Sequence, residues 1–148
     1  MMHYLSVHDI VWINQVVTGE TLAFDYEKLE EAMAAQYSYG DSTRVLAQAA
    51  QLLRTMLTKP AFEAGNRRTA LAAVAAFLGA NGHAVSTSNL EAAEAVRAVA
   101  EGRLSAQEAV ERLAGGAPDM PPGTPLRTLV AHICNQYGEA LRILAEGD

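Results

Sequence analysis

The sequence has little of what several classes of protein require. Its 148 residues include one cysteine, Cys134, which excludes an internal disulfide and is typical of the reducing cytoplasm. No stretch approaches the ~20 apolar residues that cross a membrane, and the first residues lack the basic region and apolar core of a secretory signal. We therefore expect a cytoplasmic protein with no membrane partner.

Basic charge and strand-forming residues are also scarce. The chain has 11 Lys and Arg against 17 Asp and Glu, a formal net charge of −6, which disfavours nucleic acid as a partner. Runs of Val, Ile, Thr and aromatic residues are almost absent, whereas 50% of the residues are hydrophobic and many of these are alanine. A chain of this length can bury one core. The composition therefore predicts an all-α fold, a compact bundle of helices.

Apolar residues at helical spacing, with Ser or Asp caps before several of them, predict seven helices. Their expected ranges are 7–18, 26–36, 43–59, 68–80, 89–101, 106–113 and 126–145. We divide the chain into a helical domain (1–115), a Pro/Gly linker (116–125) and a C-terminal helix (126–148). The last helix carries an apolar stripe at spacings of three and four residues. It can dock on its own domain or pair with a second copy to form a homodimer.

The stretch from Pro60 to Gly82 organises the chain. Gly65 and Asn66 suit a tight turn, and strong helix formers follow as far as the stop signal Asn81-Gly82. This pattern predicts a central helix whose amino end lies in an exposed turn.

Such a helix start offers unpaired backbone N–H groups and the positive end of the helix dipole. Arg67 and Arg68 add two positive charges at the same place. The pattern indicates a site for phosphate or another anion. The alternative is an ordinary helix start with two surface arginines.

The residues from Phe62 to Ala73 read Phe-Glu-Ala-Gly-Asn-Arg-Arg-Thr-Ala-Leu-Ala-Ala, and Phe77-Leu78 and Asn81-Gly82 follow. This run resembles the signature segment of Fic/Doc (Fido) proteins, closest to the Doc (death-on-curing) branch. That pattern is His, any residue, Phe, any residue, Asp or Glu, Gly or Ala, Asn, Lys or Gly, Arg. The resemblance covers residues 4–114. It implies a Fido-type helical bundle around a central buried helix, with Phe62 packed beneath the motif.

The resemblance also assigns roles to individual positions. Gly65, Asn66, Arg67 and Arg68 match the residues that hold phosphate, so ATP or another nucleotide is the implied ligand. The position of the family's catalytic histidine is occupied by Pro60, and that of its metal-holding acid by Ala64. Because proline supplies no base and alanine no ligand, we expect no catalytic residue and no Mg²⁺.

Three functions are compatible with these features. The first is a degenerate Fic/Doc-like protein, a non-catalytic binding or toxin–antitoxin-related protein that retains the anion site. The second is an active nucleotide-dependent transferase that phosphorylates or AMPylates a protein hydroxyl, and the third is a helical scaffold without a ligand. A protein partner could bind the flap-like loop at 19–24, by strand addition as in the family, or the C-terminal helix.

Overall fold

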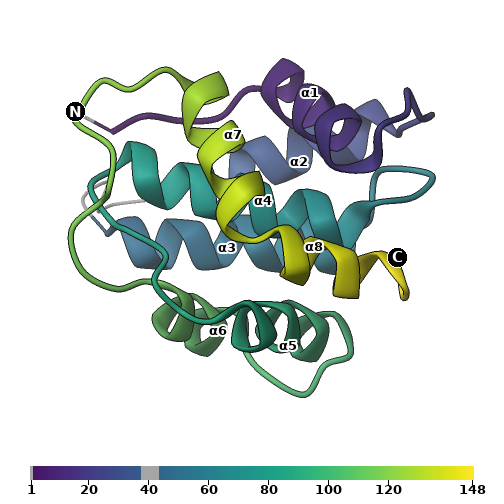
Figure 1. Ribbon diagram of the computed structural model, residues 1–148. Coiled ribbons are helices and arrows are strands. Elements are labelled where there is room, and N and C mark those ends of the chain that lie inside the picture. Colours follow the sequence, from purple (N-terminus) through teal and green to yellow (C-terminus); the bar gives the residue numbers. More distant parts are fainter. Residues whose placement is uncertain (1, 38–43) are drawn as a thin grey trace.

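The computed structural model describes residues 2–37 and 44–148. Within these ranges the chain forms eight α-helices and no β-sheet, which confirms the predicted all-α fold (Figure 1). The helices are α1 (Val7–Thr18), α2 (Tyr26–Ala35), α3 (Val45–Thr58), α4 (Asn66–Ala80), α5 (Asn89–Ala100), α6 (Ala106–Leu113), α7 (Leu126–Gln136) and α8 (Gly138–Ala145). Ser42, the expected cap of the third helix, lies outside the described residues.

Helix α4 forms the centre of the molecule. Every side chain from Thr69 to Leu78 is buried, and five of these ten residues are alanine. Small side chains let neighbouring helices approach closely, and α1, α3, α5, α7 and α8 all pack against α4. Figure 1 shows α4 passing through the middle of the bundle. A helix that is apolar on all sides is stable in water only in such a position.

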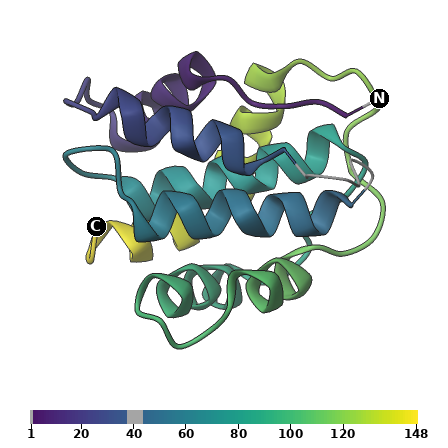
Figure 2. The ribbon, with the colours of Figure 1, turned by 180° about the vertical axis from the view of Figure 1, so that it is seen from behind.

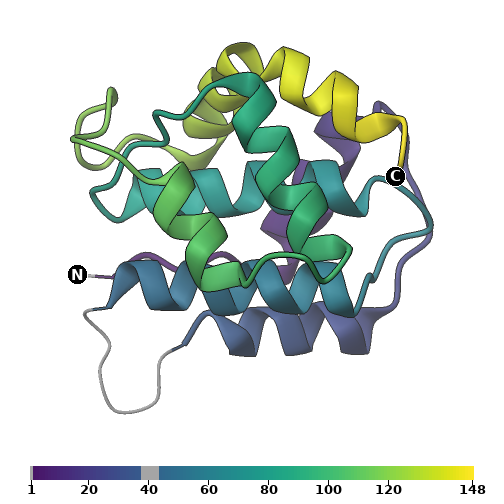
Figure 3. The same ribbon diagram turned by 90° about the horizontal axis from the view of Figure 1, so that it is seen from below.

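The remaining helices complete the shell around α4. Helix α2 packs on α3, and both lie in front of α4 when the molecule is seen from behind (Figure 2). Helices α5 and α6 pack together and against α3, and they cover the lower side of the bundle (Figure 3). None of the helices in the described ranges is long and apolar enough to cross a bilayer.

The C-terminal stretch differs from the single helix predicted for 126–145. It forms two helices, separated at Tyr137, whose backbone (φ −109°, ψ 27°) is not helical. The Tyr137 ring is fully buried, and its hydroxyl donates to the carbonyls of Val85 (3.1 Å) and Thr87 (2.8 Å). Gly138, a poor helix former, follows directly. These interactions turn the chain so that α7 packs on α4 and α8 on α5 and α4.

The two ends of the chain lie at opposite ends of α4 (Figure 1). At the carboxyl end of α4, the side chain of Asn81 accepts a hydrogen bond from the His3 N–H (2.7 Å) and donates one to the His3 carbonyl (2.8 Å). At the amino end, Asp148 contacts the first turn of α4. Each end of the central helix is therefore held by a segment that is remote in sequence.

Candidate anion-binding site at the amino end of α4

Gly65 sets the direction in which α4 begins. Its φ of +80° lies in the left-handed region, and a Cβ at this position would lie 2.3 Å from the Cγ2 of Thr18. Both the conformation and the close approach to α1 therefore require glycine. As a consequence, the residue that precedes α4 has no side chain with which to cap the helix.

Asn66 holds the turn together. Its Oδ1 accepts a hydrogen bond from the Phe62 N–H (3.0 Å), and its Nδ2 donates to the Phe62 carbonyl (2.9 Å). The Phe62 side chain is buried, and its ring centroid lies 6.0 Å from that of Phe24. The Asn66 amide is thus engaged within the turn, and only its backbone can contribute to a ligand site.

Asn14, a buried residue of α1, fixes the turn from the other side. Its Nδ2 donates to the carbonyl of Ala64 (3.1 Å) and to the Oγ1 of Thr69 (3.0 Å). A buried amide that bridges two elements fixes their relative position, because leaving either acceptor unpaired would cost free energy. No sequence pattern marks Asn14 as a site residue, since a single asparagine among the apolar residues of a helix is not distinctive.

Asp148 occupies the position at which the sequence predicts an anion. Its Oδ1 accepts a hydrogen bond from the Arg67 N–H (2.7 Å), and its Oδ2 accepts from the Arg68 N–H (3.2 Å) and from the Arg68 Nε (2.9 Å). The carboxylate is almost completely enclosed, with 2% of the side chain exposed. It takes the place of a capping side chain at the positive end of the helix dipole. The first turn of α4 therefore holds a carboxylate, which comes from the segment after α8.

The two arginines contribute differently. Arg68 directs its guanidinium into the site, where it pairs with Asp148 and also donates from Nη1 to the Val17 carbonyl (3.3 Å). Arg67 contributes its backbone N–H. Its guanidinium lies beside Gly147, so close that a Cβ built on Gly147 would be 3.1 Å from the Nη1 of Arg67. Of the two positive side chains predicted at the site, Arg68 is the one that touches the anion.

The flap-like loop lies next to the same turn. Phe24 forms an antiparallel bridge with Phe62, flanked by hydrogen bonds from the Asp25 N–H to the Ala61 carbonyl (2.8 Å) and from the Glu63 N–H to the Ala23 carbonyl (3.0 Å). In this pattern the N–H and C=O of Phe24 point away from the turn, because successive residues of an extended chain face opposite sides. The Phe24 side chain is 43% exposed. An extended edge is thus open beside the anion site.

The positions that the resemblance links to catalysis hold no catalytic group. Pro60 is exposed, and its carbonyl accepts a hydrogen bond from Lys28 Nζ (3.4 Å). Ala64 presents its carbonyl to Asn14. Across residues 2–37 and 44–148, no group of three or more His, Cys, Asp or Glu side chains is placed to hold a metal ion.

None of the four histidines reaches the site. His3 and His83 lie at the carboxyl end of α4, and His132 lines a small cavity at that same end. His8 is near the start of α1, ten residues before Thr18, and at ~1.5 Å of rise per residue it is about 15 Å from the site. No histidine side chain therefore lies at the turn where the resembled family has its catalytic histidine and this chain has Pro60.

In comparisons with protein-family models, curated proteins and solved structures, no match to this chain was found. The assignment of a function consequently depends on the geometry of the site and on the resemblance of the segment from Phe62 to Gly82.

Proposed function

We propose that this protein is a degenerate Fic/Doc-like binding protein that takes a phosphate group at the amino end of α4 and has no transferase activity. The observation that supports this proposal is the Asp148 carboxylate, held by two backbone N–H groups and the Arg68 guanidinium. Phosphate oxygens are recognised by the same donors, helix N-terminal amides and arginine. ATP, another nucleotide or free phosphate is the proposed ligand.

In this proposal the ligand competes with Asp148. The carboxylate is bound within the same chain, so a phosphate binds only in the fraction of molecules from which the C-terminal residues have moved away. The apparent dissociation constant is then the intrinsic one divided by that fraction. Movement of the last residues past Ala145, where α8 ends, would open the site without disturbing the core.

Binding rather than catalysis is favoured by the residues around the site. A transferase of this family would need a proton acceptor and a metal-holding acid at the positions of Pro60 and Ala64, and neither of these residues can fill those roles. A protein partner of the toxin–antitoxin type is the second part of the proposal. The open edge at Phe24 offers it a backbone with which to pair.

Thermal unfolding in the presence of ATP or inorganic phosphate tests the proposal. We would compare the wild type with Asp148→Ala, which removes the competing carboxylate, and with Arg68→Ala, which removes the charged donor. Saturation at 100 times the dissociation constant should stabilise the protein by ~2.7 kcal/mol. We expect the unfolding temperature of Asp148→Ala to rise at lower ligand concentrations than that of the wild type. That of Arg68→Ala should rise little or not at all.

The matched control is Glu146→Ala. Glu146 is an exposed acid two residues before Asp148, and its contact is with Arg142 (3.8 Å) rather than with α4. This variant should respond like the wild type. If neither nucleotide nor phosphate shifts the unfolding of Asp148→Ala, the proposed anion binding is wrong, and Asp148 is a structural cap only.

The absence of transferase activity requires a separate test. The wild type and Asp148→Ala would be incubated with ATP labelled in the α- or γ-phosphate and a cell lysate. We expect no labelled protein band. A band that disappears in Arg68→Ala would show that the chain is an active transferase.

A further inference from the structure

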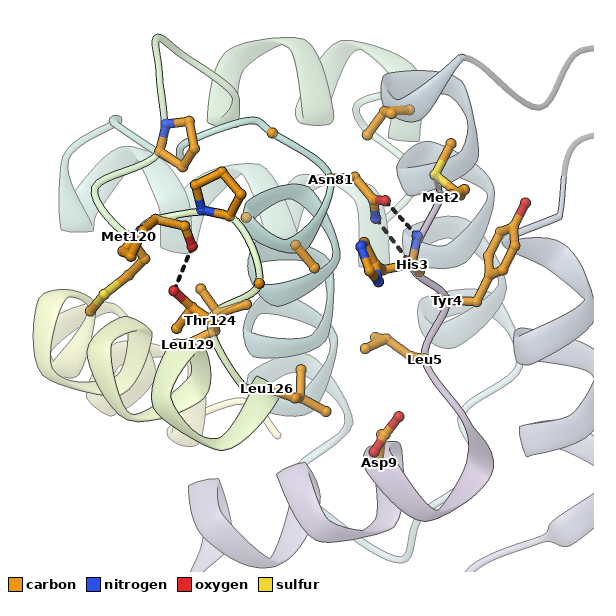
Figure 4. A pocket seen from close by; sticks show the side chains of 18 residues that line it. Met2, His3, Tyr4, Leu5, Asp9, Asn81, Met120, Thr124, Leu126 and Leu129 are labelled. Carbon is orange, nitrogen blue, oxygen red and sulfur yellow. Dashed lines mark hydrogen bonds between the residues drawn. The ribbon is translucent and has the colours of Figure 1, made fainter.

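A cavity at the other end of α4 takes no part in the anion site. Its volume is about 820 Å³, which is within the range of ~300–1,000 Å³ typical of small-molecule sites. The extended N-terminal segment forms one wall and the segment from Pro118 to Leu129 forms the other (Figure 4). We refer to it as the α4 carboxyl-end groove.

The groove exists because its floor lacks bulky side chains. The floor is formed by the last turn of α4 and the two residues after it, where Gly79, Ala80 and Gly82 line the space. The walls supply apolar side chains, Met2, Leu5, Met120, Leu126 and Leu129 (Figure 4). Asn81 joins the floor to one wall through its two hydrogen bonds with the His3 backbone. The floor is therefore formed by the core helix α4, whereas the wall before Leu126 is a non-helical segment.

The described lining of the groove carries one carboxylate and no lysine or arginine side chain. Asp9 carries the carboxylate, and His3 carries an imidazole. One oxygen of Asp9 accepts a hydrogen bond from the Ser6 N–H (2.8 Å), and the half-buried carboxylate faces the groove in Figure 4.

The carboxyl end of α4 adds to this negative character. Its backbone carbonyls form the negative end of the helix dipole, and the last turn of α4 has no basic side chain to neutralise it. The amino end of α7, at Leu126, also lies at the groove and contributes the positive end of its helix dipole. An anionic ligand would be favoured there by the positive end of the α7 dipole.

We propose that the α4 carboxyl-end groove binds an organic cation with an apolar body, a molecule of the arylalkylamine class. The apolar part would lie between Met120, Leu126 and Leu5, and the ammonium group would face Asp9 and the end of α4. This ligand site is independent of the anion site, since the two lie at opposite ends of a helix of 15 residues, ~22 Å apart by helical rise.

Three indole compounds of nearly equal size test the proposal: tryptamine is a cation, tryptophol is neutral and indole-3-propionate is an anion. Binding of each to the full chain would be measured by calorimetry and by NMR shifts of backbone amides. We expect tryptamine to bind most tightly, with shifts in the segments 3–9, 79–82 and 118–129. Equal or tighter binding of tryptophol or indole-3-propionate would overturn the assignment of a cationic ligand.

Two substitutions locate the ligand. Asp9→Asn keeps the acceptor for the Ser6 N–H but removes the charge, and should weaken tryptamine about two- to five-fold, as for a partly exposed ion pair, without affecting tryptophol. Ala80→Phe fills the floor and should abolish binding of all three compounds. Circular dichroism of each variant verifies that the helices are intact, and Asp9→Asn still tests the proposal if Ala80→Phe fails to fold.

Arg68→Ala separates this proposal from the anion site. It should leave tryptamine binding unchanged while it reduces phosphate binding. If no compound binds up to its solubility limit, the proposed small-molecule site is wrong.

Discussion

The Oδ2 of Asp148 lies 2.9 Å from the Nε of Arg68, although the two residues are 80 positions apart in the chain. The same carboxylate receives two backbone N–H groups of α4, which begins after a glycine and has no cap of its own. This contact therefore has two consequences. It stabilises the first turn of the central helix, and it occupies the donors at which we propose that a ligand anion binds.

These two consequences are quantitatively linked. Asp148→Ala should lower the free energy of unfolding by about 1–2 kcal/mol in the absence of ligand, because a cap and an ion pair at a helix N-terminus contribute this much. Since 1.4 kcal/mol corresponds to a factor of ten, the same substitution should tighten phosphate binding about five- to thirty-fold. Urea unfolding gives the first quantity and calorimetric titration gives the second.

If the loss in the free energy of unfolding matches the gain in the free energy of phosphate binding, Asp148 competes directly with phosphate. If the substitution lowers stability and leaves the affinity for phosphate unchanged, the ligand binds elsewhere. Glu146→Ala, which removes a nearby acid of the same tail that is not in contact with α4, should change neither quantity.

Gly65 offers a second test, on the turn that forms the site. Gly65→Ala should lower the free energy of unfolding by at least about 2 kcal/mol, from the left-handed backbone and from the contact of the new Cβ with Thr18. Thr18→Ser removes the Cγ2 that the new Cβ would meet at 2.3 Å and keeps the hydroxyl that donates to the Asn14 carbonyl.

The double variant separates the loss of stability caused by the left-handed backbone from that caused by the contact with Thr18. Gly65→Ala in the Thr18→Ser background should be less destabilising than in the wild type, while the backbone part of the cost remains. Equal costs in both backgrounds, measured by urea unfolding, would mean that the close approach of α1 to the turn does not constrain residue 65.

The fold was largely predictable from the sequence because its signals are local. Alanine-rich periodic stretches and capping residues such as Ser88 and Ser105 predicted six of the helices to within a few residues. The break at Tyr137 was not predicted, since the apolar stripe continues through it. The chain turns there because the Tyr137 hydroxyl reaches the carbonyls of Val85 and Thr87, which only the folded structure brings together.

The candidate site was predictable only in part, for the same reason. The turn at Gly65 and the positive end of α4 could be derived from neighbouring residues. Asp148 could not, because no local pattern distinguishes an aspartate after a helix that caps another helix from one that is solvated. The sequence also predicted both arginines as ligand side chains, whereas the structure directs Arg67 toward Gly147.

Cys134 provides a test of burial in the C-terminal helices. Burial raises the pKa of the Cys134 thiol above its ordinary value. Because the thiolate is the reactive form, alkylation by iodoacetamide at about pH 8 should be several-fold slower in the folded protein than in urea. The midpoint of the pH–rate profile should also lie above that of the unfolded chain. Equal rates and midpoints would show that α7 does not remain docked on α4.

Tyr137 provides the corresponding test at the junction of α7 and α8. Its hydroxyl donates to two backbone carbonyls within the core, so Tyr137→Phe leaves these acceptors without that donor. We expect a loss of about 1–2 kcal/mol in the free energy of unfolding near neutral pH. Tyr26→Phe is the matched control, because Tyr26 is 56% exposed and should show no loss.

The pH dependence of this loss follows from the environment of the Tyr137 hydroxyl. Burial, and secondarily the charge of Asp119, raises the pKa of Tyr137 in the folded protein above its ordinary value. Between the ordinary pKa of ~10 and the higher folded value, the unfolded chain releases this proton and the folded chain does not, so wild-type stability falls as the pH rises, by up to ~1.4 kcal/mol per pH unit. Tyr137→Phe has no hydroxyl to titrate at this position. The difference in stability between it and the wild type should therefore narrow above about pH 10. In urea unfolding, a difference that stays constant to higher pH would contradict the burial of this hydroxyl, and Tyr26→Phe should follow the wild type throughout.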